Sequence, residues 1–581
     1  MQNPDVARIL EEIADLLEID GANQFRVRAY RTAARTLRDL PVPVADLVRT
    51  GRDLTEYRGI GADLAGKIAT IVATGSLPLH RQLTRRIPAG LLGLLRIPGI
   101  GPKRVRMLHD QLGIRTPAGL RRALDAGRLT GVKGFGPRMV SVIHAGLGRA
   151  AKAERRMLLP EAEANAVPLE RYLAGAPGVS QATVAGSYRR RKETVGDLDV
   201  LVTARHPADA LARFAAYPEI AKVLARGPTR ATVRLAGGVQ VDLRAVSPQS
   251  YGAALVYFTG SKAHNLELRA IAQSRGLKLN EYGLFRGSRR VAGATEAQVY
   301  RALGLDWIPP ELREARGEIA LAAAHRLPAL VTLTDVRGDL QMHTTASDGQ
   351  TGLTELARAA EARGYEYIAV TDHSRRVTMA HGLDARRLRA QWRAVDAWNR
   401  GHHGLTILKS VEVDILEGGG LDLPDDVLAE ADYVVAALHY GTRQTEREIT
   451  RRLVGAARHP WVDAIGHPTG RLLETRAPYP LDFDALARAA ADAGCLLEIN
   501  GQPERMDLPD TLAAAARARG VRFVLSTDSH HPVHLAFMRY AVDIARRAGL
   551  ERSDIANTLP LTRFREALKR HTGRSRMRRA G

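Results

Sequence analysis

The chain has 581 residues but a single cysteine, Cys495, so an intramolecular disulfide is excluded. This thiol lies in the apolar run 494–497, and we expect it to be a buried strand residue in a reducing compartment. No stretch of about 18 apolar residues is present, and residues 1–5 lack the basic-then-apolar order of a secretory signal. We therefore expect a protein of the cytoplasm that has no membrane partner.

Acidic residues are also in short supply, since 63 Asp and Glu stand against 85 Lys and Arg and give a formal net charge of +22. A basic surface attracts polyanions because binding releases condensed counterions. An excess of arginine also arises from a GC-rich genome or from a solvated surface with no partner, so charge alone leaves nucleic-acid binding open. With 45% apolar residues, the chain has enough core material for about three to five domains.

The first 150 residues carry a repeated glycine motif. Residues 3–17 place a proline in the first turn and apolar residues at helical spacing, which predicts an amphipathic helix. At intervals of roughly 35 to 40 residues, three Gly-x-Gly pairs follow, namely Gly59 and Gly61, Gly99 and Gly101, and Gly134 and Gly136. Glycine lets the backbone turn sharply, so that N–H groups at the start of the next helix come close to a phosphate. One copy is typical of a simple turn, whereas three copies in basic surroundings resemble the helix-hairpin-helix motif, which implies binding of the DNA backbone.

Two aspartates alternate in a strand-like run in the middle of the chain. Asp197 and Asp199 lie in the segment 196–202, so both carboxylates point to one face of the strand. Asp242 comes from a second alternating segment, 239–244. Three converging carboxylates fit two Mg²⁺ or Mn²⁺ ions about 3.5–4 Å apart, one activating a hydroxyl and the other holding a triphosphate.

A glycine-serine element in the segment 186–190 precedes these acids. Ser187 and Arg190 are predicted to bind phosphate oxygens, together with the backbone of Gly196. An isolated Asp-x-Asp pair is typical of an exposed polar face, but the combination of Gly-Ser, Asp-x-Asp and a later Asp resembles the nucleotidyltransferase superfamily. Members of that superfamily act on DNA, RNA, proteins or antibiotics, so the acceptor stays open at this point.

The next segment closely resembles the nucleotide-binding segment of family X DNA polymerases. It reads Tyr-Phe-Thr-Gly-Ser-Lys-Ala-His-Asn over 257–265, and segments 276–284 and 308–313 continue the similarity. The resemblance implies sugar packing and exclusion of a 2′-hydroxyl for Tyr257 and Phe258, nucleotide contact for Gly260, a base-edge contact in the minor groove for Asn265, and a template contact for Arg269. The alternative is that Tyr257 and Phe258 are ordinary core aromatics.

Lys67 follows the first glycine pair, where DNA polymerases of the beta type keep a lysine that forms a Schiff base with an abasic sugar. Such a lysine needs partial desolvation or cationic neighbours to lower its pKa. Asp63 stands where the beta enzyme has an assisting lysine, which is a departure from the pattern. A lyase nucleophile and a phosphate-contacting lysine are both open interpretations of Lys67.

After an Ala-rich stretch near residues 315–335, short apolar segments alternate with Ala- and Arg-rich helices. The segments 367–370, 433–438 and 523–526 are typical strands of a β/α barrel. Candidate metal ligands recur at the ends of such strands, where the active-site face of a barrel lies, and these are His343, Asp348, His373, Glu412, His439, His467, Asp528 and His530. A single histidine is typical of an ordinary surface or core position. The shared placement favours a cluster of Zn²⁺ or Mn²⁺ ions that activates water against a phosphoester.

This arrangement resembles the PHP (polymerase and histidinol phosphatase) domain, which bacterial family X polymerases carry behind the thumb. The resemblance implies 3′–5′ exonuclease activity, with 3′-phosphatase or abasic-site endonuclease action as further options. Many PHP domains read His-x-His where this chain has Gln341-Met342-His343. Because an amide binds metal poorly, Gln341 predicts that one metal site is loose or empty.

The predicted fold is multidomain, α+β and α/β, with helical helix-hairpin-helix domains, a nucleotidyltransferase-type palm with a mixed β-sheet, a small thumb and a distorted (β/α)7-type PHP barrel. The expected divisions are a lyase-like DNA-binding domain at 1–84, a fingers-type helix-hairpin-helix domain at 85–150, the palm at 151–247, the thumb at 248–316, a linker at 317–335 and the PHP domain at 336–575.

The predicted function is gap filling in base excision repair by two-metal nucleotidyl transfer, with exonuclease activity in the PHP domain. The expected partners are gapped or nicked double-stranded DNA and deoxynucleoside triphosphates, and we expect a monomer associated with the bacterial nucleoid. Two alternatives are a nucleotidyltransferase that acts on another acceptor and a DNA-binding nucleotidyltransferase whose PHP domain is structural or weakly active.

Overall fold

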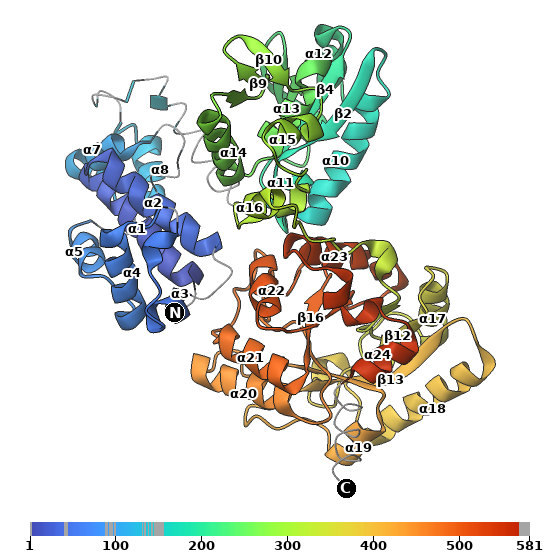
Figure 1. Cartoon of the computed structure of the whole chain (residues 1–581). Coiled ribbons are helices and arrows are strands. Elements are labelled where there is room, and N and C mark those ends of the chain that lie inside the picture. The colour runs from blue at the N-terminus through green and yellow to red at the C-terminus, as the bar shows by residue number, and fades with distance from the viewer. Residues whose placement is uncertain are drawn as a thin grey trace. The chain divides into compact units, whose positions relative to one another are not determined.

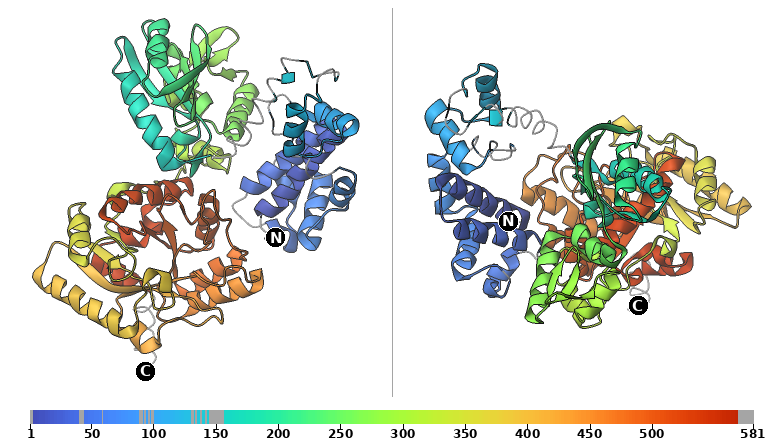
Figure 2. Two further views of the ribbon diagram at one scale, coloured as in Figure 1. Left: turned by 180° about the vertical axis from the view of Figure 1, so that it is seen from behind. Right: turned by 90° about the horizontal axis from the view of Figure 1, so that it is seen from above.

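The computed structural model divides the chain into two compact units, Met1–Arg156 and Met157–Gly581, and Figures 1 and 2 draw it from three directions. The residues that the structure describes are 3–39, 44–57, 59–87, 91, 94, 97, 100–129, 132, 135–136, 139–140, 143 and 156–568. Over these ranges, no helix is long and apolar enough to cross a membrane.

The N-terminal unit is built from helices. They include α1 (Asn3–Asp20), α2 (Gln24–Asp39), α3 (Val44–Arg49), α4 (Ala62–Thr74), α5 (Pro78–Arg86), α7 (Pro102–Leu112) and α8 (Pro117–Asp125). Leu10, Ile13 and Leu17 of α1 are buried, which confirms the predicted amphipathic helix. Apolar side chains of the other helices join them in one cluster, because each helix presents an apolar face at helical spacing.

The second unit begins with the predicted mixed sheet of the palm. Its strands lie in the order β2-β4-β7-β6-β5, with β4 parallel to β7 and the other neighbours antiparallel. The elements of this part are β1 (Met157–Leu158), α10 (Leu159–Ala174), β2 (Val179–Val184), α11 (Gly186–Arg189), β3 (Thr194–Val195), β4 (Leu198–Ala204), α12 (Pro207–Ala215), β5 (Ile220–Arg226), β6 (Arg230–Leu235) and β7 (Gln240–Ala245).

The thumb packs around a separate apolar cluster. Its elements are α13 (Tyr251–Thr259), α14 (Lys262–Ser274), β8 (Lys278–Asn280), β9 (Gly283–Arg286), β10 (Arg289–Ala292), α15 (Glu296–Ala302) and α16 (Glu318–Ala323). Helix α16 lies in the stretch 317–335 that the sequence predicts as a linker. Ile319 and Ala322 of this helix pack into the thumb cluster, so the stretch begins as part of the thumb.

The C-terminal part contains a seven-stranded parallel sheet whose strands follow one another in sequence order. They are β11 (Gly338–Asp339), β12 (Tyr367–Val370), β13 (Thr406–Asp414), β14 (Tyr433–Ala437), β15 (Ala464–Ile465), β16 (Leu496–Asn500) and β17 (Phe523–Ser526). A parallel bridge between Met342 and Ser529 nearly closes the sheet into a barrel, which confirms the predicted fold. The helices around it are α17 (Leu353–Glu361), α18 (Ala385–Gly401), α19 (Asp425–Glu430), α20 (Glu446–Arg458), α21 (Phe483–Ala493), α22 (Asp510–Arg517), α23 (Met538–Arg547) and α24 (Leu561–Ala567).

Two details differ slightly from the sequence-based expectation. Strand β14 ends at Ala437, one residue earlier than predicted. Cys495 is buried as predicted, but it lies directly before β16 rather than within it.

Candidate active sites

The three predicted acids of the palm lie on two neighbouring parallel strands. Asp199 of β4 is in register with Asp242 of β7, and Asp197 lies directly before β4. Because side chains alternate along a strand, Asp197 and Asp199 share a face while Leu198 between them is buried. The palm therefore presents three carboxylates on one face of its sheet.

The charges of these acids act on one another. Burial, and then the charges of Asp197 and Asp242, raise the pKa of Asp199 to about 7. Asp242 accepts a hydrogen bond from Thr232 Oγ1 at 2.5 Å and another from Gln240 Nε2 at 2.8 Å. This donor set fits divalent cations, because oxygen ligands suit Mg²⁺ and Mn²⁺ and a cation offsets the mutual repulsion of carboxylates.

The glycine-serine element forms the short helix α11 directly beside the acids. Gly186 has a φ of +65°, and a Cβ atom there would lie 2.9 Å from Oδ2 of Asp199. The backbone N–H of Ala185 donates to the carbonyl of Asp199 at 2.7 Å. Glycine is therefore needed at position 186 to bring the Ser187 turn against β4.

Arg190 links this turn to the helix that carries the predicted sugar-contacting aromatics. Its Nε donates to Oε1 of Glu314 at 3.0 Å, and its Nη1 donates to the carbonyl of Thr259, the last residue of α13. A Cβ atom on Gly260 would lie 3.3 Å from Nη1 of Arg190. Arg189, to which the sequence assigned no role, makes two hydrogen bonds to Glu296 of the thumb at 2.8 and 2.9 Å.

The predicted nucleotide-binding residues of α13 and α14 lie together. The rings of Tyr257 and Phe258 are 4.9 Å apart, and both side chains are half-buried. The guanidinium of Arg269 lies 5.2 Å from the centre of the Tyr257 ring, and Nδ2 of Asn265 donates to the Tyr257 carbonyl at 2.7 Å. Phe258 also has the guanidinium of Arg244 4.8 Å from its ring centre, so each of the two half-buried rings packs against an arginine. Gly196 lies in an exposed bend next to Asp197.

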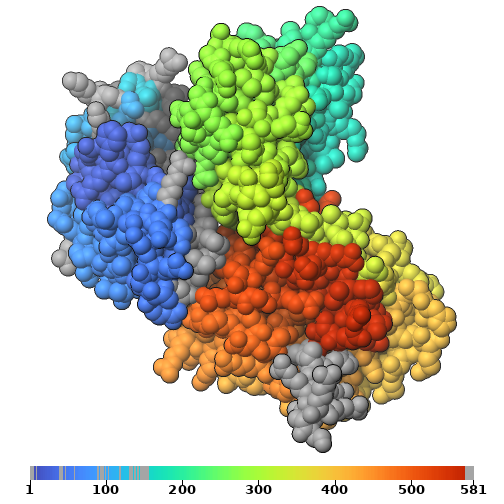
Figure 3. Space-filling view, viewed as in Figure 1, coloured from blue at the N-terminus to red at the C-terminus, as the bar shows by residue number. Residues whose placement is uncertain are grey.

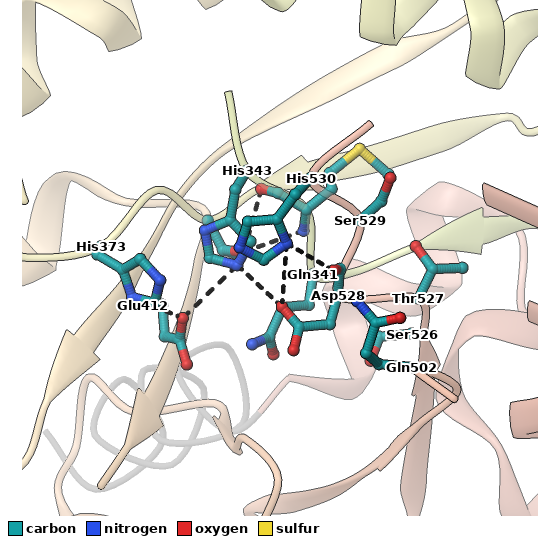
Figure 4. Close-up of polar contacts among 12 residues, drawn as sticks. Gln341, His343, His373, Glu412, Gln502, Ser526, Thr527, Asp528, Ser529 and His530 are labelled. Carbon is teal, nitrogen blue, oxygen red and sulfur yellow. Dashed lines mark hydrogen bonds and ion pairs between the residues drawn. The ribbon is translucent and has the colours of Figure 1, made fainter. Parts of the chain in front are cut away.

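All eight candidate ligands of the barrel come together at the carboxyl ends of its strands. Figure 4 shows His343, His530 and Asp528 turned toward one another, with His373 and Glu412 beside them. Contacts that join the set are His343 Nε2–Asp528 Oδ1 at 3.1 Å, His373 Nδ1–Glu412 Oε2 at 3.0 Å, His439 Nε2–Glu412 Oε1 at 3.4 Å, His467 Nε2–Glu412 Oε1 at 2.9 Å, His373 Nε2–Asp348 Oδ2 at 3.5 Å and His530 Nε2–Asp348 Oδ2 at 3.4 Å.

Two subsets of this cluster have the geometry of metal sites. Within each subset, the candidate ligand atoms lie within 4.8 Å of one another, and the subsets are His343, Asp348, His373 and His530, and His373, Glu412 and His439. Burial opposes the charged form of His530, but Asp348 and Asp528 together outweigh it and raise the pKa of His530 to about 9. Imidazoles held by carboxylates in this way suit Zn²⁺ or Mn²⁺.

The backbone is strained at two of the eight candidates. His467 has a φ of +27° and Asp528 a φ of +51°, both in the left-handed region that side chains other than glycine rarely adopt. Such strain concentrates at functional sites, because the surrounding structure must hold it in place. The two residues therefore stand apart from ordinary turn positions.

Polar residues that the sequence analysis missed support the cluster. Oδ1 of Asp414 lies 3.0 Å from Nδ1 of His439, and Asn500 Nδ2 donates to Oδ2 of Asp528 at 3.1 Å. Glu498 accepts from the backbone N–H of His467 and is fully buried, which raises its pKa well above the usual range. Asp414 stands two residues after Glu412 on β13 and could have been found by strand alternation, whereas Glu498 and Asn500 lie in an apolar strand with no histidine.

Gln341 and Arg505 make one corner of the cluster differ from the rest. Gln341 is buried, and neither of its amide atoms has a hydrogen-bond partner within the described ranges. Nε of Arg505 lies 3.3 Å from Oδ2 of Asp528. The weakly ligating amide of Gln341 therefore stands where the usual pattern has an imidazole. Arg505 adds a positive charge beside Asp528. This corner fits a metal ion less well than the two subsets do.

The glycine repeats of the N-terminal unit share one backbone arrangement. The N–H groups of Ile60, Ile100 and Phe135 donate to the carbonyl three residues earlier at 3.0, 2.9 and 3.0 Å. At the start of the helix that follows each repeat, a backbone N–H donates to the carbonyl of the second glycine. These hydrogen bonds are Ala65 to Gly61 at 2.9 Å, Val105 to Gly101 at 3.0 Å and Val140 to Gly136 at 3.0 Å. Gly59 has a φ of +87°, while Gly99 and Gly134 lie outside the described residues.

Lys67 lies on α4, close to a pocket of about 670 Å³ that is lined by Tyr30, Gly59, Gly61 and Asp63 among others. Its Nζ donates to Oδ2 of Asp63 at 2.5 Å and sits 5.3 Å from the Tyr30 ring centre. Burial acts to lower the pKa of Lys67, but Asp63 and Tyr30 outweigh it and raise that pKa. A charged amine is suited to a phosphate contact and is a poor nucleophile.

Sequence models of known domains match this chain in four places. The matches are a helix-hairpin-helix domain at 1–77, a SAM-like helix-hairpin-helix tandem at 91–148, the DNA polymerase beta palm at 161–226 and the DNA polymerase beta thumb at 254–314. Their order along the chain agrees with the helical unit, the mixed sheet and the thumb described above.

Individual relatives extend the similarity to the C-terminal barrel. DNA polymerase/3′-5′ exonuclease PolX of Bacillus subtilis strain 168 is 36% identical over 575 residues, which is 98% of this chain and 100% of that protein. A probable phosphatase of Thermoanaerobacter sp. strain X514 is 30% identical over 253 residues, 40% of this chain and 94% of that protein. A probable phosphatase of Acetivibrio thermocellus is 29% identical over 250 residues, 41% of this chain and 97% of that protein. The chain therefore belongs to the family X DNA polymerases, in the bacterial group that joins a polymerase of the beta type to a C-terminal PHP domain.

Proposed function

We propose that the chain is a DNA-directed DNA polymerase that fills short gaps during base excision repair and trims 3′ ends with its PHP domain. The observation that carries the polymerase half is the register of Asp199 with Asp242 on β4 and β7, beside the Gly186 turn. The printed name of the Bacillus subtilis relative, which combines polymerase and 3′-5′ exonuclease, supports both halves.

In the polymerase site, Asp197, Asp199 and Asp242 would hold two Mg²⁺ or Mn²⁺ ions. When bound, these ions lower the barrier to in-line attack of a primer 3′-hydroxyl on the first phosphate and stabilise the pyrophosphate that leaves. Donors to the triphosphate are the Ser187 hydroxyl, the Gly196 backbone and the Arg190 guanidinium.

The half-buried aromatics select the nucleotide. Tyr257 and Phe258 pack against the sugar, and the room left by them disfavours a 2′-hydroxyl. Asn265 contacts the base edge, Gly260 lets the backbone approach the nucleotide, and Arg269 contacts the template strand. Deoxynucleoside triphosphates are accordingly the proposed substrates.

In the PHP site, we propose a centre of two ions, Zn²⁺ or Mn²⁺. One would be held by His343, Asp348, His373 and His530, and the other by His373, Glu412 and His439 together with His467. Bound ions of this kind make water a stronger nucleophile and polarise a phosphoester, which suits removal of a 3′ nucleotide. Asp528, which lies 3.1 Å from His343, would be a further ligand, and Arg505 supplies positive charge next to Asp528 for a substrate phosphate. 3′-Phosphatase and abasic-site endonuclease activity use the same attack on a phosphoester.

The helix-hairpin-helix and family X domains imply DNA binding, and we propose gapped or nicked duplexes as the form bound. The N–H groups at the helix starts after Gly61, Gly101 and Gly136, with the Gly59 turn, would contact the DNA backbone, and the same role for Gly99 and Gly134 stays a prediction outside the described residues. Lys67 contacts a phosphate in this proposal, in keeping with its pairing to Asp63. The domain divisions, the monomeric state and the nucleoid location given above stay predictions.

Nucleotide addition to a primer on single-nucleotide-gapped DNA tests the polymerase half. Asp242→Asn keeps the side-chain volume but removes a charge from the ligand set, so we expect addition to fall by about 100-fold or more. Asp209→Asn removes an exposed carboxylate of the palm and serves as the control, with wild-type addition expected. Normal addition by the Asp242 variant would overturn the assignment.

A second candidate function is a polymerase whose PHP domain is structural or weakly active. The corner formed by Gln341 and Arg505 is the observation that favours it. Measuring the metal content of the wild type and of His467→Ala separates the two functions. An active PHP site should hold ions that His467→Ala releases, whereas a structural domain need not hold them.

A further inference from the structure

The turn that carries the proposed phosphate donors is tied to the C-terminal domain. Nη1 of Arg547, in α23, donates to the backbone carbonyl of Arg190 at 2.6 Å. Nη2 of the same guanidinium donates to Oε1 of Glu314 at 3.1 Å and to Oδ2 of Asp510 at 2.6 Å. Arg547 is 4% exposed, so these contacts are made away from bulk water.

Glu314 connects Arg547 to the side chain of Arg190. The same oxygen, Oε1, accepts from Nε of Arg190 at 3.0 Å, and Nζ of Lys192 lies 3.9 Å away. Burial opposes the charge of Glu314, but Arg547 and its neighbours outweigh it and lower the pKa of Glu314 to about 2. Glu314 is therefore an ionised carboxylate shared between Arg190 and a cation from the C-terminal domain.

Neighbouring contacts hold the same surfaces together. Nε of Arg191 donates to Oδ2 of Asp543 at 2.8 Å, and Nε of Arg546 donates to Oε1 of Glu311 at 2.8 Å. Buried apolar residues of the palm and the barrel belong to one continuous cluster. Figure 1 places α11 and α16 next to α23, and the yellow-green and red surfaces abut in the space-filling view (Figure 3).

We propose that Arg547 is a positioning residue of the polymerase site, because it holds the Arg190 backbone in place and offsets part of the negative charge of Glu314. This inference rests on the proposed polymerase function and extends it to a residue 357 positions away in the sequence. Glu314 holds the Arg190 guanidinium through Nε and therefore competes with the phosphate oxygens of a triphosphate for its positive charge. Without Arg547, the full charge of Glu314 acts on Arg190 and competes with the nucleotide.

Steady-state nucleotide addition by the full chain on single-nucleotide-gapped DNA tests this role. We expect Arg547→Met to raise the KM for the nucleotide by about tenfold with kcat changed less than about twofold. Arg547→Lys keeps a charge beside Glu314 and should restore part of the KM. Arg539→Met is the matched control, because Arg539 lies on the same helix and pairs with Glu163 of the palm at 2.7 Å, whereas its link to the turn runs only through the 3.6 Å contact of Glu163 with Arg191.

A background of Glu314→Gln sharpens the test and also covers the case in which Arg547→Met does not fold. If Arg547 acts through Glu314, Arg547→Lys should change the KM much less in that background than in the wild type. Wild-type KM in Arg547→Met, an equal rise in Arg539→Met, or a Lys effect that is the same in both backgrounds would each overturn the inference. Failure of the wild type itself to add nucleotides would refute the proposed function instead, which is a distinguishable result.

Discussion

Gly186 is the point at which the phosphate-binding turn and the acids come closest. Its φ is +65°, and a Cβ atom at this position would lie 2.9 Å from Oδ2 of Asp199, so alanine there must strain the backbone or displace the carboxylate. We expect Gly186→Ala to lower nucleotide addition by about tenfold or more, since such strain costs ~1–3 kcal/mol. Gly237→Ala, in a β6–β7 turn with open space around it, should leave addition unchanged. Wild-type kinetics in Gly186→Ala would show that this close approach does not matter.

Gln341 provides a test of the proposed two-ion centre. The Gln341 amide binds metal poorly, whereas a histidine at this position would supply an imidazole ligand. Gln341→His should therefore raise the metal content from about two to about three ions per chain. Elemental analysis after dialysis measures this content directly. Gln298→His places the same side chain on an exposed face of α15 and should leave the count unchanged. Three ions in the wild type would contradict the account of this corner.

At this scale, the sequence led to the residues that recur in motifs and missed those that support them. Asp197, Asp199 and Asp242 could be predicted to converge, because strand alternation sets the direction of a side chain. Arg505 and Asn500 could not, because the approach of Arg505 to Asp528 depends on where the loop after β16 folds back, and that of Asn500 on the pairing of β16 with β17.

At the scale of elements, the thumb helices meet at a buried histidine. Nδ1 of His264, in α14, lies 2.7 Å from Oε1 of Glu318 in α16, and Nε2 lies 2.8 Å from the hydroxyl of Tyr300 in α15. Burial lowers the pKa of His264, although Glu318 opposes the shift. The neutral imidazole therefore holds three helices together.

Acid should weaken this junction. Because the pKa is lower in the folded state, the unfolded chain takes up the proton more readily, and the stability that His264 contributes is present above its ordinary pKa of about 6.5 and lost as the pH falls below it. We expect the unfolding temperature of the wild type to drop between about pH 8 and about pH 5.5. In His264→Gln, this drop should be smaller by about 2–4 °C. His325→Gln, which replaces an exposed histidine of the same domain, should keep the full drop. An identical drop in His264→Gln would refute this assignment.

Elements were more predictable than their junctions. The strands β12 and β17 have the predicted bounds, since short apolar runs between Ala-rich helices fix a β/α rhythm. The sequence instead assigns helix α16 to a linker, because its six residues are rich in alanine and carry no helical period long enough to recognise. Glu318 is buried against His264, 54 positions away in the sequence, and the spacing of residues along the chain does not predict such a contact.

For the whole molecule, the order of domains followed from the motifs, but their coupling did not. The contact of Arg547 with Glu314 joins positions 233 residues apart, and neither residue belongs to a recognised active-site motif. Ion pairs of this kind leave no periodic signal in a single sequence. The structure thus adds a physical connection between the phosphate-binding turn of the palm and helix α23 of the C-terminal domain.

The central claim is that one chain carries two independent phosphoryl-transfer centres. Its most direct test is a paired assay of nucleotide addition and 3′ trimming on gapped DNA, with wild type, Asp197→Ala and His467→Ala. We expect Asp197→Ala to lose addition by about 100-fold or more but still to trim, and His467→Ala to lose trimming but still to add nucleotides. Normal addition by Asp197→Ala, or loss of both activities in either variant while the protein remains folded, would contradict this claim.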